Sequence, residues 1–159
     1  MITEPHKRLP ARGLLAWRIS GTIHSVFPLL ISGGIIALAV LFNWPIWVTG
    51  ASLMFFSAYA YFVIMILPAL RWKRLRYEVR ENEIELKSGI FVIKRTLVPM
   101  IRVQHVDTKQ GPILRKYRLA TVTISTAATV HEIPALDVEE AEELRFFISQ
   151  LARVADDDV

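Results

Sequence analysis

The sequence predicts an α+β membrane protein in which an N-terminal two-helix transmembrane hairpin precedes a small β-barrel with a C-terminal α-helix. Residues 19–70 include no Asp, Glu, Lys or Arg, although 19 basic and 15 acidic residues occur elsewhere in the 159-residue chain. From residue 77 onward, apolar and polar side chains alternate in short runs, as in half-buried strands. From residue 138, apolar residues recur at steps of three and four, as in an amphipathic helix.

The uncharged stretch is long enough to cross a membrane twice. One charge at the bilayer centre costs about 2.5–3.5 kcal/mol, so a membrane segment avoids charge, whereas a soluble domain has no reason to do so. A span needs roughly 20 apolar residues. Asn43-Trp44-Pro45 divides the stretch into spans at about 19–42 and 46–70. Backbone groups in lipid are satisfied within the segment, so both spans should be helices joined as an antiparallel hairpin. A cleaved signal peptide or two buried helices of a soluble core fit this pattern less well.

Basic residues flank the hairpin on both sides. They are Lys7, Arg8, Arg12 and Arg18 before the first span and Arg71, Lys73, Arg74 and Arg76 after the second. Because positive residues stay on the cytoplasmic side, both termini should be cytoplasmic. These side chains are the predicted contacts with membrane lipids, since attraction to anionic lipid contributes about 1 kcal/mol per basic residue near the surface. We therefore expect a basic cytoplasmic segment at 1–18 and the hairpin at 19–75.

The alternation after the hairpin predicts a domain of short antiparallel strands at 76–155. The expected strands are 77–80, 83–87, 91–98, 102–108, 121–125 and a weaker last strand at 129–133 that ends before Pro134. Val103 and Val106 break the strict alternation of the fourth strand, which is compatible with a β-bulge there.

A helix should complete this domain. Asp137 is a favourable N-cap, and Glu140 three residues later fits a capping-box pattern. The apolar stripe consists of Val138, Ala141, Leu144, Ile148 and Leu151. This face should pack on the sheet or cover the open end of the barrel. Residues 156–159 should form a solvated acidic tail.

Composition excludes several classes of function. The chain has no cysteine, and therefore no disulfide, cysteine metal site or cysteine nucleophile. Residues 77–159 contain 11 basic and 14 acidic side chains, which argues against nucleic acid as a partner. His131-Glu132 lacks the second histidine of a zinc-protease helix. Ser125 has no nucleophile elbow around it that would support a triad with His105 and Asp107. We expect no enzyme activity, no catalytic residue, no metal and no cofactor.

Several motifs resemble a known family. They are the run at 98–107, Gly111-Pro-Ile-Leu-Arg115, Leu119-Ala120, Thr126-Ala127, Arg76-Tyr77 after the hairpin, and the glutamate-rich start of the last helix at 139–142. Together they resemble the bacterial pleckstrin-homology (PH) domain of YdbS-like membrane proteins, across essentially the whole chain. The resemblance implies a PH-like barrel capped by a C-terminal helix, the inner membrane of a bacterium, and no established catalytic activity. Arg118 and Ala128 depart from the family, which usually has glycine at both turns, so the loop shapes there are in question.

The densest polar group of the domain lies in its fourth predicted strand. It consists of Arg102, Gln104, His105 and Asp107. In a regular strand Val103, His105 and Asp107 would share one face, with Arg102 and Gln104 on the other. The group is either an interaction surface or a structural feature. In the structural interpretation Asp107 pairs with a nearby arginine or caps a turn, and His105 donates one hydrogen bond.

A basic cluster of Arg115, Lys116 and Arg118 follows in the connector. It could hold phosphate groups or an acidic partner, or it could be a solvated face. PH domains that bind phosphoinositides usually place basic residues around the first hairpin. Here that turn, 80–83, is net acidic, so phosphoinositide binding is not expected.

These observations lead to a binding function. We expect a membrane-anchored, non-enzymatic scaffold that presents the PH-like domain at the cytoplasmic face and belongs to a membrane protein complex. The resemblance implies a larger membrane protein with related PH-like domains as a partner, and a homo-oligomer is a further expectation. Two alternatives stay open: a module that senses or handles anionic lipids, and a small subunit of a transporter or membrane enzyme in which the hairpin is the working part.

Overall fold

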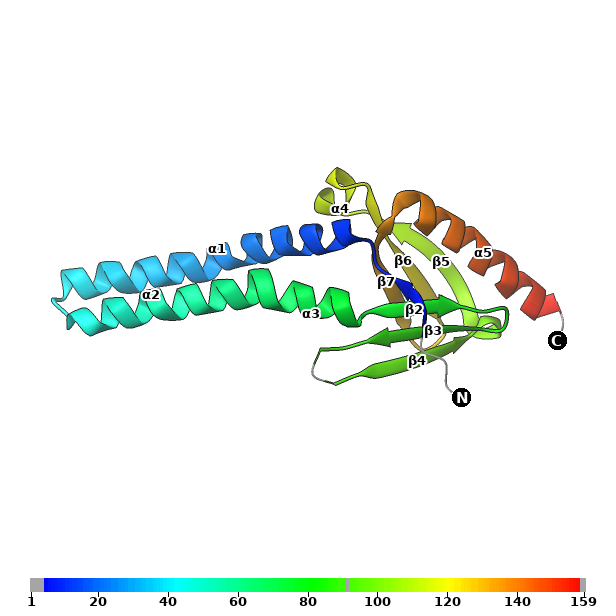
Figure 1. Cartoon of the computed structure of the whole chain (residues 1–159), viewed down its shortest axis with the longest axis horizontal. Coiled ribbons are helices and arrows are strands. Elements are labelled where there is room, and N and C mark those ends of the chain that lie inside the picture. The colour runs from blue at the N-terminus through cyan, green and yellow to red at the C-terminus, as the bar shows by residue number, and fades with distance from the viewer. Residues whose placement is uncertain (1–4, 91, 158–159) are drawn as a thin grey trace. The chain divides into compact units, whose positions relative to one another are not determined.

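The computed structural model describes residues 5–90 and 92–157 (Figure 1). The chain forms two compact units. One contains Met1–Ala16 together with Leu70–Val159, and the other contains Trp17–Ala69.

The helical unit is formed by an antiparallel hairpin. Its helices are α1 (Ala11–Leu41), α2 (Ile46–Tyr61), a π-helical segment (Phe62–Ile66) and α3 (Leu67–Arg74). Ala11–Leu41 and Ile46–Arg74 are long and apolar enough to cross a membrane. Large apolar side chains such as Phe27 and Phe55 are exposed, as lipid-facing residues are expected to be. The predicted two-helix hairpin is confirmed.

The two helices of the hairpin approach closely at Gly21. A Cβ atom there would lie 2.8 Å from the carbonyl oxygen of Val63, which belongs to the π-helical segment. Nearer the turn, the hydroxyl oxygens of Ser32 and Ser52 are 2.9 Å apart and form a hydrogen bond between the helices. Small residues at such contacts allow backbones to pack closely in a membrane, where packing and hydrogen bonds drive association.

The N-terminal segment belongs to the unit that contains the strands. Lys7–Arg8 form strand β1, which pairs antiparallel with β2 (Arg76–Val79) through Lys7↔Tyr77 and Arg8↔Arg76. The indole nitrogen of Trp72 donates to the carbonyl oxygen of Leu9 at 3.0 Å. The basic segment predicted at 1–18 therefore contains a strand that the sequence did not reveal, because a two-residue strand is too short to show alternation.

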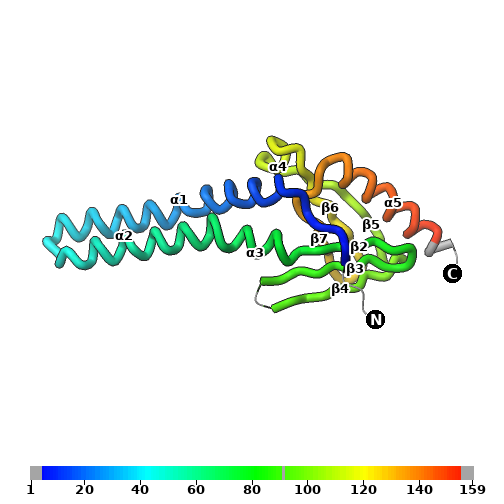
Figure 2. The backbone as a smooth tube through the Cα atoms, in the orientation of Figure 1, coloured from blue at the N-terminus to red at the C-terminus, as the bar shows by residue number. Residues whose placement is uncertain are grey.

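The strands form two sheets. β1 and β2 continue into β3 (Glu83–Ser88) and β4 (Lys94–Pro99) in the order β1-β2-β3-β4. The second sheet contains β5 (Val103–Lys109), β6 (Leu119–Thr126) and β7 (Val130–Asp137) in the order β5-β6-β7. Within the described residues the sheets do not pair with each other, so the predicted barrel is not closed (Figure 2). The short helix α4 (Pro112–Lys116) connects β5 to β6.

Several strand boundaries differ from the prediction, and three of the differences are the most informative. β4 starts at Lys94, later than predicted, and Phe91 lies outside the described residues. Arg102 belongs to the 3₁₀ turn Met100–Arg102 that precedes β5. β7 continues through Pro134 to Asp137, because β7 is an outer strand and the β6–β7 register shifts between Ala120 and Val122, opposite Pro134. A bulge on an outer strand tolerates the missing N–H of proline.

Helix α5 (Val138–Asp157) completes the domain and lies along the sheet β5-β6-β7 (Figure 1). Its buried face carries Ala141, Leu144 and Ile148, three of the five predicted stripe residues. The core that it covers consists of fully buried side chains from both sheets, among them Tyr77, Ile84, Leu119, Val122, Ile124, Ile133 and Leu136. The helix includes two residues of the predicted acidic tail, and residues 158–159 lie outside the described part.

Candidate binding surfaces

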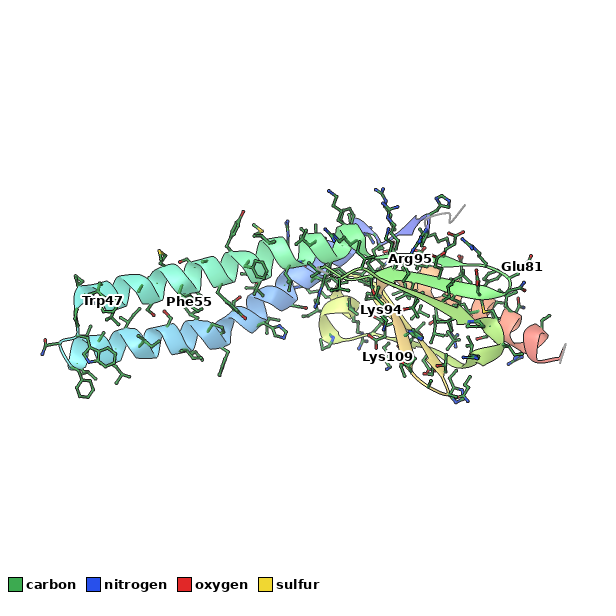
Figure 3. All side chains as sticks on the ribbon, turned by 90° about the horizontal axis from the view of Figure 1, so that it is seen from below. Trp47, Phe55, Glu81, Lys94, Arg95 and Lys109 are labelled. Carbon is green, nitrogen blue, oxygen red and sulfur yellow. The ribbon has the colours of Figure 1, made fainter. Side chains whose placement is uncertain are left out.

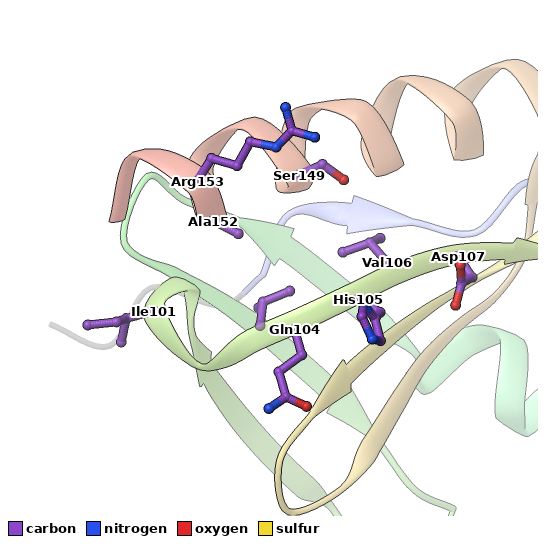
Figure 4. Close-up of a pocket in the computed structure, with 9 residues that line it drawn as sticks. Ile101, Gln104, His105, Val106, Asp107, Ser149, Ala152 and Arg153 are labelled. Atoms are coloured by element: carbon purple, nitrogen blue, oxygen red, sulfur yellow. The ribbon is translucent and has the colours of Figure 1, made fainter. Parts of the chain in front are cut away.

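A β-bulge reshapes the polar group around β5. Val103 is the register partner of Thr126 and His105 that of Ser125, so Gln104 is the extra residue of the strand. The bulge compatible with the sequence is thereby confirmed, and it changes the predicted faces. Gln104, His105 and Asp107 are all exposed, and Arg102 is exposed on the preceding 3₁₀ turn. In Figure 4, Gln104 and His105 lie on the side of β5 away from α5, while Val106 points toward α5.

A groove with a volume of about 800 Å³ runs between β5 and the last turns of α5 (Figure 4). Ile101, Val106 and Ala152 contribute apolar surface, and Ile101 is 52% exposed. β5 is the outer strand of its sheet among the described strands. An outer strand beside a groove offers backbone groups and side-chain pockets to an added strand.

The structural interpretation of this polar group is not supported. Among the described residues, neither Asp107 nor His105 makes a hydrogen bond or an ion pair with another side chain or with the backbone outside regular pairing. Thr108 does have a structural role. It lies on the side of β5 toward α5, and its hydroxyl donates a hydrogen bond to Oε1 of Glu142 at 2.8 Å. Asp107 and His105 are therefore available to a partner.

A second cleft brings together residues that are far apart in the sequence. It has a volume of about 800 Å³, and Arg12, Arg115 and Arg118 line it together with Gln110, Asp137 and Glu139. Nη1 of Arg12 lies 3.9 Å from Oδ1 of Asp137. Lys116 does not line this cleft, so the predicted basic cluster divides between the cleft and the open surface. The mixture of arginine and carboxylate makes the cleft less suited to a phosphate than the sequence pattern indicated.

The turn at Arg118 keeps the shape that glycine would favour. Arg118 has a φ of 55°, in the left-handed region, and its carbonyl oxygen accepts a hydrogen bond from the amide of Val138 at 3.2 Å. Ala128, the other departure from the family pattern, does not adopt a positive φ. The loop at Arg118 thus keeps a glycine-like shape at the cost of backbone strain, because a side chain in this region costs roughly 1–2 kcal/mol.

Relief of this strain can be measured. We expect Arg118→Gly to make the full chain about 1 kcal/mol more stable than Arg118→Ala, because both variants remove the guanidinium but only alanine keeps the strain. Chemical denaturation in detergent, followed by circular dichroism, compares the two variants. Ala128→Gly is the control and should lower stability slightly, since glycine there adds only freedom to the unfolded chain. Equal stability of the two Arg118 variants would contradict the assignment.

A third cleft, of about 320 Å³, is predominantly basic. Leu70, Lys73, Arg74, Arg76, Lys87, Ser88, Gly89 and Ile93 line it. Arg8, Arg76, Lys87 and Arg95 are successive register partners across all four strands of the first sheet. Lys73, Arg74 and Arg76 were predicted from the sequence, but Lys87 and Ile93 were not, because only the pairing of the strands brings these two residues to the end of α3.

The remaining predicted lipid contacts occupy the ends of the hairpin helices and the first strand. Lys7 and Arg8 are exposed on β1, Arg12 and Arg18 lie on α1, and Arg71 is exposed on α3. Lys7 also lies over the ring of Tyr77, with its Nζ 5.9 Å from the ring centre.

The other end of the first sheet is acidic and internally paired. Arg80 lies 3.3 Å from carboxylate oxygens of Glu78 and Glu83 and 3.5 Å from one of Glu85. Glu85 is nearly buried and also pairs with Arg95 at 3.4 Å. Arginine and glutamate therefore satisfy each other at this hairpin.

Comparison with known proteins gives consistent matches. The model of the bacterial PH domain family matches residues 18–152. The chain is 51% identical over 159 residues, the full length of both proteins, to the UPF0699 transmembrane protein YdbS of Bacillus subtilis (strain 168). It is 29% identical over 116 residues to the UPF0699 transmembrane protein YdbT of the same organism, and this match covers 70% of the present chain and 20% of YdbT. No solved structure matches significantly.

Proposed function

Since the chain belongs to the bacterial PH domain family, we propose that it is a non-enzymatic binding protein, anchored in the membrane by its hairpin, that presents its PH domain at the cytoplasmic face within a membrane protein complex. That it is a membrane protein follows from its full-length similarity to a transmembrane protein and from its two long apolar helices. The binding role, the absence of catalysis and the cytoplasmic orientation are the proposal.

The groove between β5 and α5 is the observation on which the binding role depends. Main-chain groups of an outer strand provide affinity for an extended segment, and neighbouring pockets provide selectivity. Ile101 and Val106 supply apolar contact, and the free carboxylate of Asp107 supplies a charged one. The groove thus offers both apolar and polar groups, and protein interfaces commonly use both.

The hairpin would strengthen such binding. A domain held at the membrane meets membrane partners at a raised effective concentration, so a groove of modest affinity is sufficient. The basic flanks at Lys7–Arg8 and Arg71–Arg76 favour the cytoplasmic side for both ends of the hairpin.

The proposed partner is a larger membrane protein that carries related PH domains. The similarity to one fifth of the length of YdbT shows that a sequence of this kind also occurs within a much longer transmembrane protein. A relative with the same fold would offer an outer strand of its own, and exposed outer strands pair readily with one another. A second copy of the present chain is the other partner that this argument admits.

Crosslinking in native membranes followed by affinity purification of the full chain in mild detergent tests the proposal. We expect a recurrent partner, identified by mass spectrometry as a membrane protein with PH domains. Ile101→Asp should reduce its recovery about tenfold or more, because it replaces an apolar group of the groove with a charged one, and loss of an anchoring contact commonly costs about 2 kcal/mol or more.

Val130→Asp is the matched control, since Val130 is 55% exposed on the outer strand β7 and does not line the groove. Purification of a lone monomer, or equal recovery with both variants, would contradict the proposal. Retained function after exchange of the hairpin for an unrelated one would exclude the alternative in which the hairpin is the working part.

A further inference from the structure

The loop between β3 and β4, residues 89–93, exposes apolar side chains where turn residues are expected. Val92 is 80% exposed and Ile93 is 55% exposed. Hairpin turns favour Gly, Asn, Asp and Ser, and here Gly89 alone meets that preference. Gly89 has a φ of 115°, and a Cβ atom on it would overlap the carbonyl oxygen of Val92. The backbone therefore turns tightly between Gly89 and Val92, and the side chains of Val92 and Ile93 are exposed, while Phe91 lies outside the described residues.

The loop lies where the polypeptide leaves the second membrane span. β2 starts two residues after α3 ends and pairs antiparallel with β3, so the end of β3 returns to the end of α3. Nη1 of Arg74 donates to the carbonyl oxygen of Ile90 at 2.7 Å. Leu70, the last residue of the uncharged stretch, lines the same cleft as Ile93. The loop therefore lies beside the part of the chain where the apolar span ends and the basic residues begin.

The two ends of the first sheet differ in charge. Exposed Lys73 and Arg74 on α3 and exposed Lys94 on β4 surround the loop. The opposite end of the same strands carries Glu81 and Glu83, and Figure 3 shows Lys94 and Glu81 at opposite ends. Apolar side chains within a ring of basic ones suit the interface of a bilayer, where acyl chains and phosphates lie within a few ångströms of each other.

We propose that the β3–β4 loop inserts Val92 and Ile93 into the interfacial layer of the membrane that the hairpin spans, while Lys73 and Lys94 contact lipid phosphates. The occupant of this surface is the phospholipid bilayer. Continuity with the end of α3 and the charge of the surrounding residues favour lipid over a protein partner. This contact is independent of the groove at β5 and goes beyond the proposed binding function.

Single-site fluorescence labelling tests the proposal on the full chain. Because the chain has no cysteine, Val92→Cys provides one labelling site for an environment-sensitive dye. In vesicles of phosphatidylcholine and phosphatidylglycerol, emission from the dye should shift to the blue, and lipids carrying a doxyl quencher near the headgroup should reduce its intensity. Asn82→Cys, in the exposed turn at the other end of the sheet, is the matched control and should show water-like, unquenched emission.

The emission of dyes at positions 92 and 82 distinguishes insertion of the β3–β4 loop from the other arrangements. Water-like emission at both positions would overturn insertion, and a blue shift at position 92 without quenching by doxyl lipid would assign the loop to a protein contact instead. Equal quenching at both positions would mean that the domain lies flat on the bilayer rather than contacting it through the loop. The double variant Lys73→Glu/Lys94→Glu should reduce quenching in vesicles that contain phosphatidylglycerol, and an unchanged signal would overturn the phosphate contact.

Discussion

Replacing Tyr77 with alanine is expected to destabilise the PH domain by about 3–5 kcal/mol, the usual cost of emptying a large aromatic site in a core. The Tyr77 side chain is fully buried, and its hydroxyl donates to Oε1 of Glu140 at 2.7 Å, which joins β2 to α5. Tyr77→Phe separates the two contributions. It keeps the ring and should cost about 1.5–3 kcal/mol, the value of a hydrogen bond to a charged group. Chemical denaturation of the full chain in detergent measures both losses.

The same residue makes stability depend on alkaline pH. Burial, and next the hydrogen bond to Glu140, raise the pKa of Tyr77 above its ordinary value of 10.0. Above that pH the unfolded chain loses the proton while the folded chain keeps it, so stability that is complete below pH 10.0 declines as the pH rises further. Tyr77→Phe should show a shallower decline than the natural chain. Identical slopes for the two proteins would contradict the assignment.

Replacing Gly21 with alanine is expected to destabilise the hairpin by about 1–3 kcal/mol, the usual cost of overpacking. The added methyl group would meet the backbone at Val63, which cannot move aside as a flexible side chain could. The carbonyl oxygen of Val63 belongs to the π-helical segment Phe62–Ile66.

Two other glycines of the hairpin are matched controls. A methyl group added at Gly33 or Gly50 would have no atom within 4 Å, so alanine there should be neutral or should stabilise the helix by up to about 1 kcal/mol. Unfolding of each variant in mixed micelles with increasing denaturing detergent compares the three sites. Equal resistance of Gly21→Ala and Gly33→Ala to the denaturing detergent would show that the close approach at Gly21 does not limit helix packing.

The parts of the fold that were predictable share one property: their signals are local and repeated. The hairpin follows from a long run without charge, and α5 follows from a stripe of which three residues, Ala141, Leu144 and Ile148, are buried. Most strand positions follow from alternation of the same kind. The family, too, was identified from motifs that are contiguous in the sequence, and the comparisons confirm it.

The features that the sequence did not predict depend on pairing between segments that are far apart in the chain. β1 has two residues and acquires its strand conformation from Tyr77 and Arg76 rather than from its own pattern. Pro134 predicted a strand end, yet the bulge on an outer strand accommodates it. The cleft that contains both Arg12 and Arg115 could not be predicted from the sequence, because about a hundred residues separate the two arginines. Nothing in the residues around either arginine indicates contact with the other.

The pairing of β1 with β2 has a mechanical consequence. The segments that enter and leave the hairpin are direct register partners, Arg8 with Arg76, so the polypeptide closes a loop around all its lipid-embedded residues. Any tension or rotation applied to one strand of this junction is transmitted to the other through backbone hydrogen bonds before it reaches the rest of the sheet. The junction therefore resists separation of the two chain segments that continue into the helices of the hairpin.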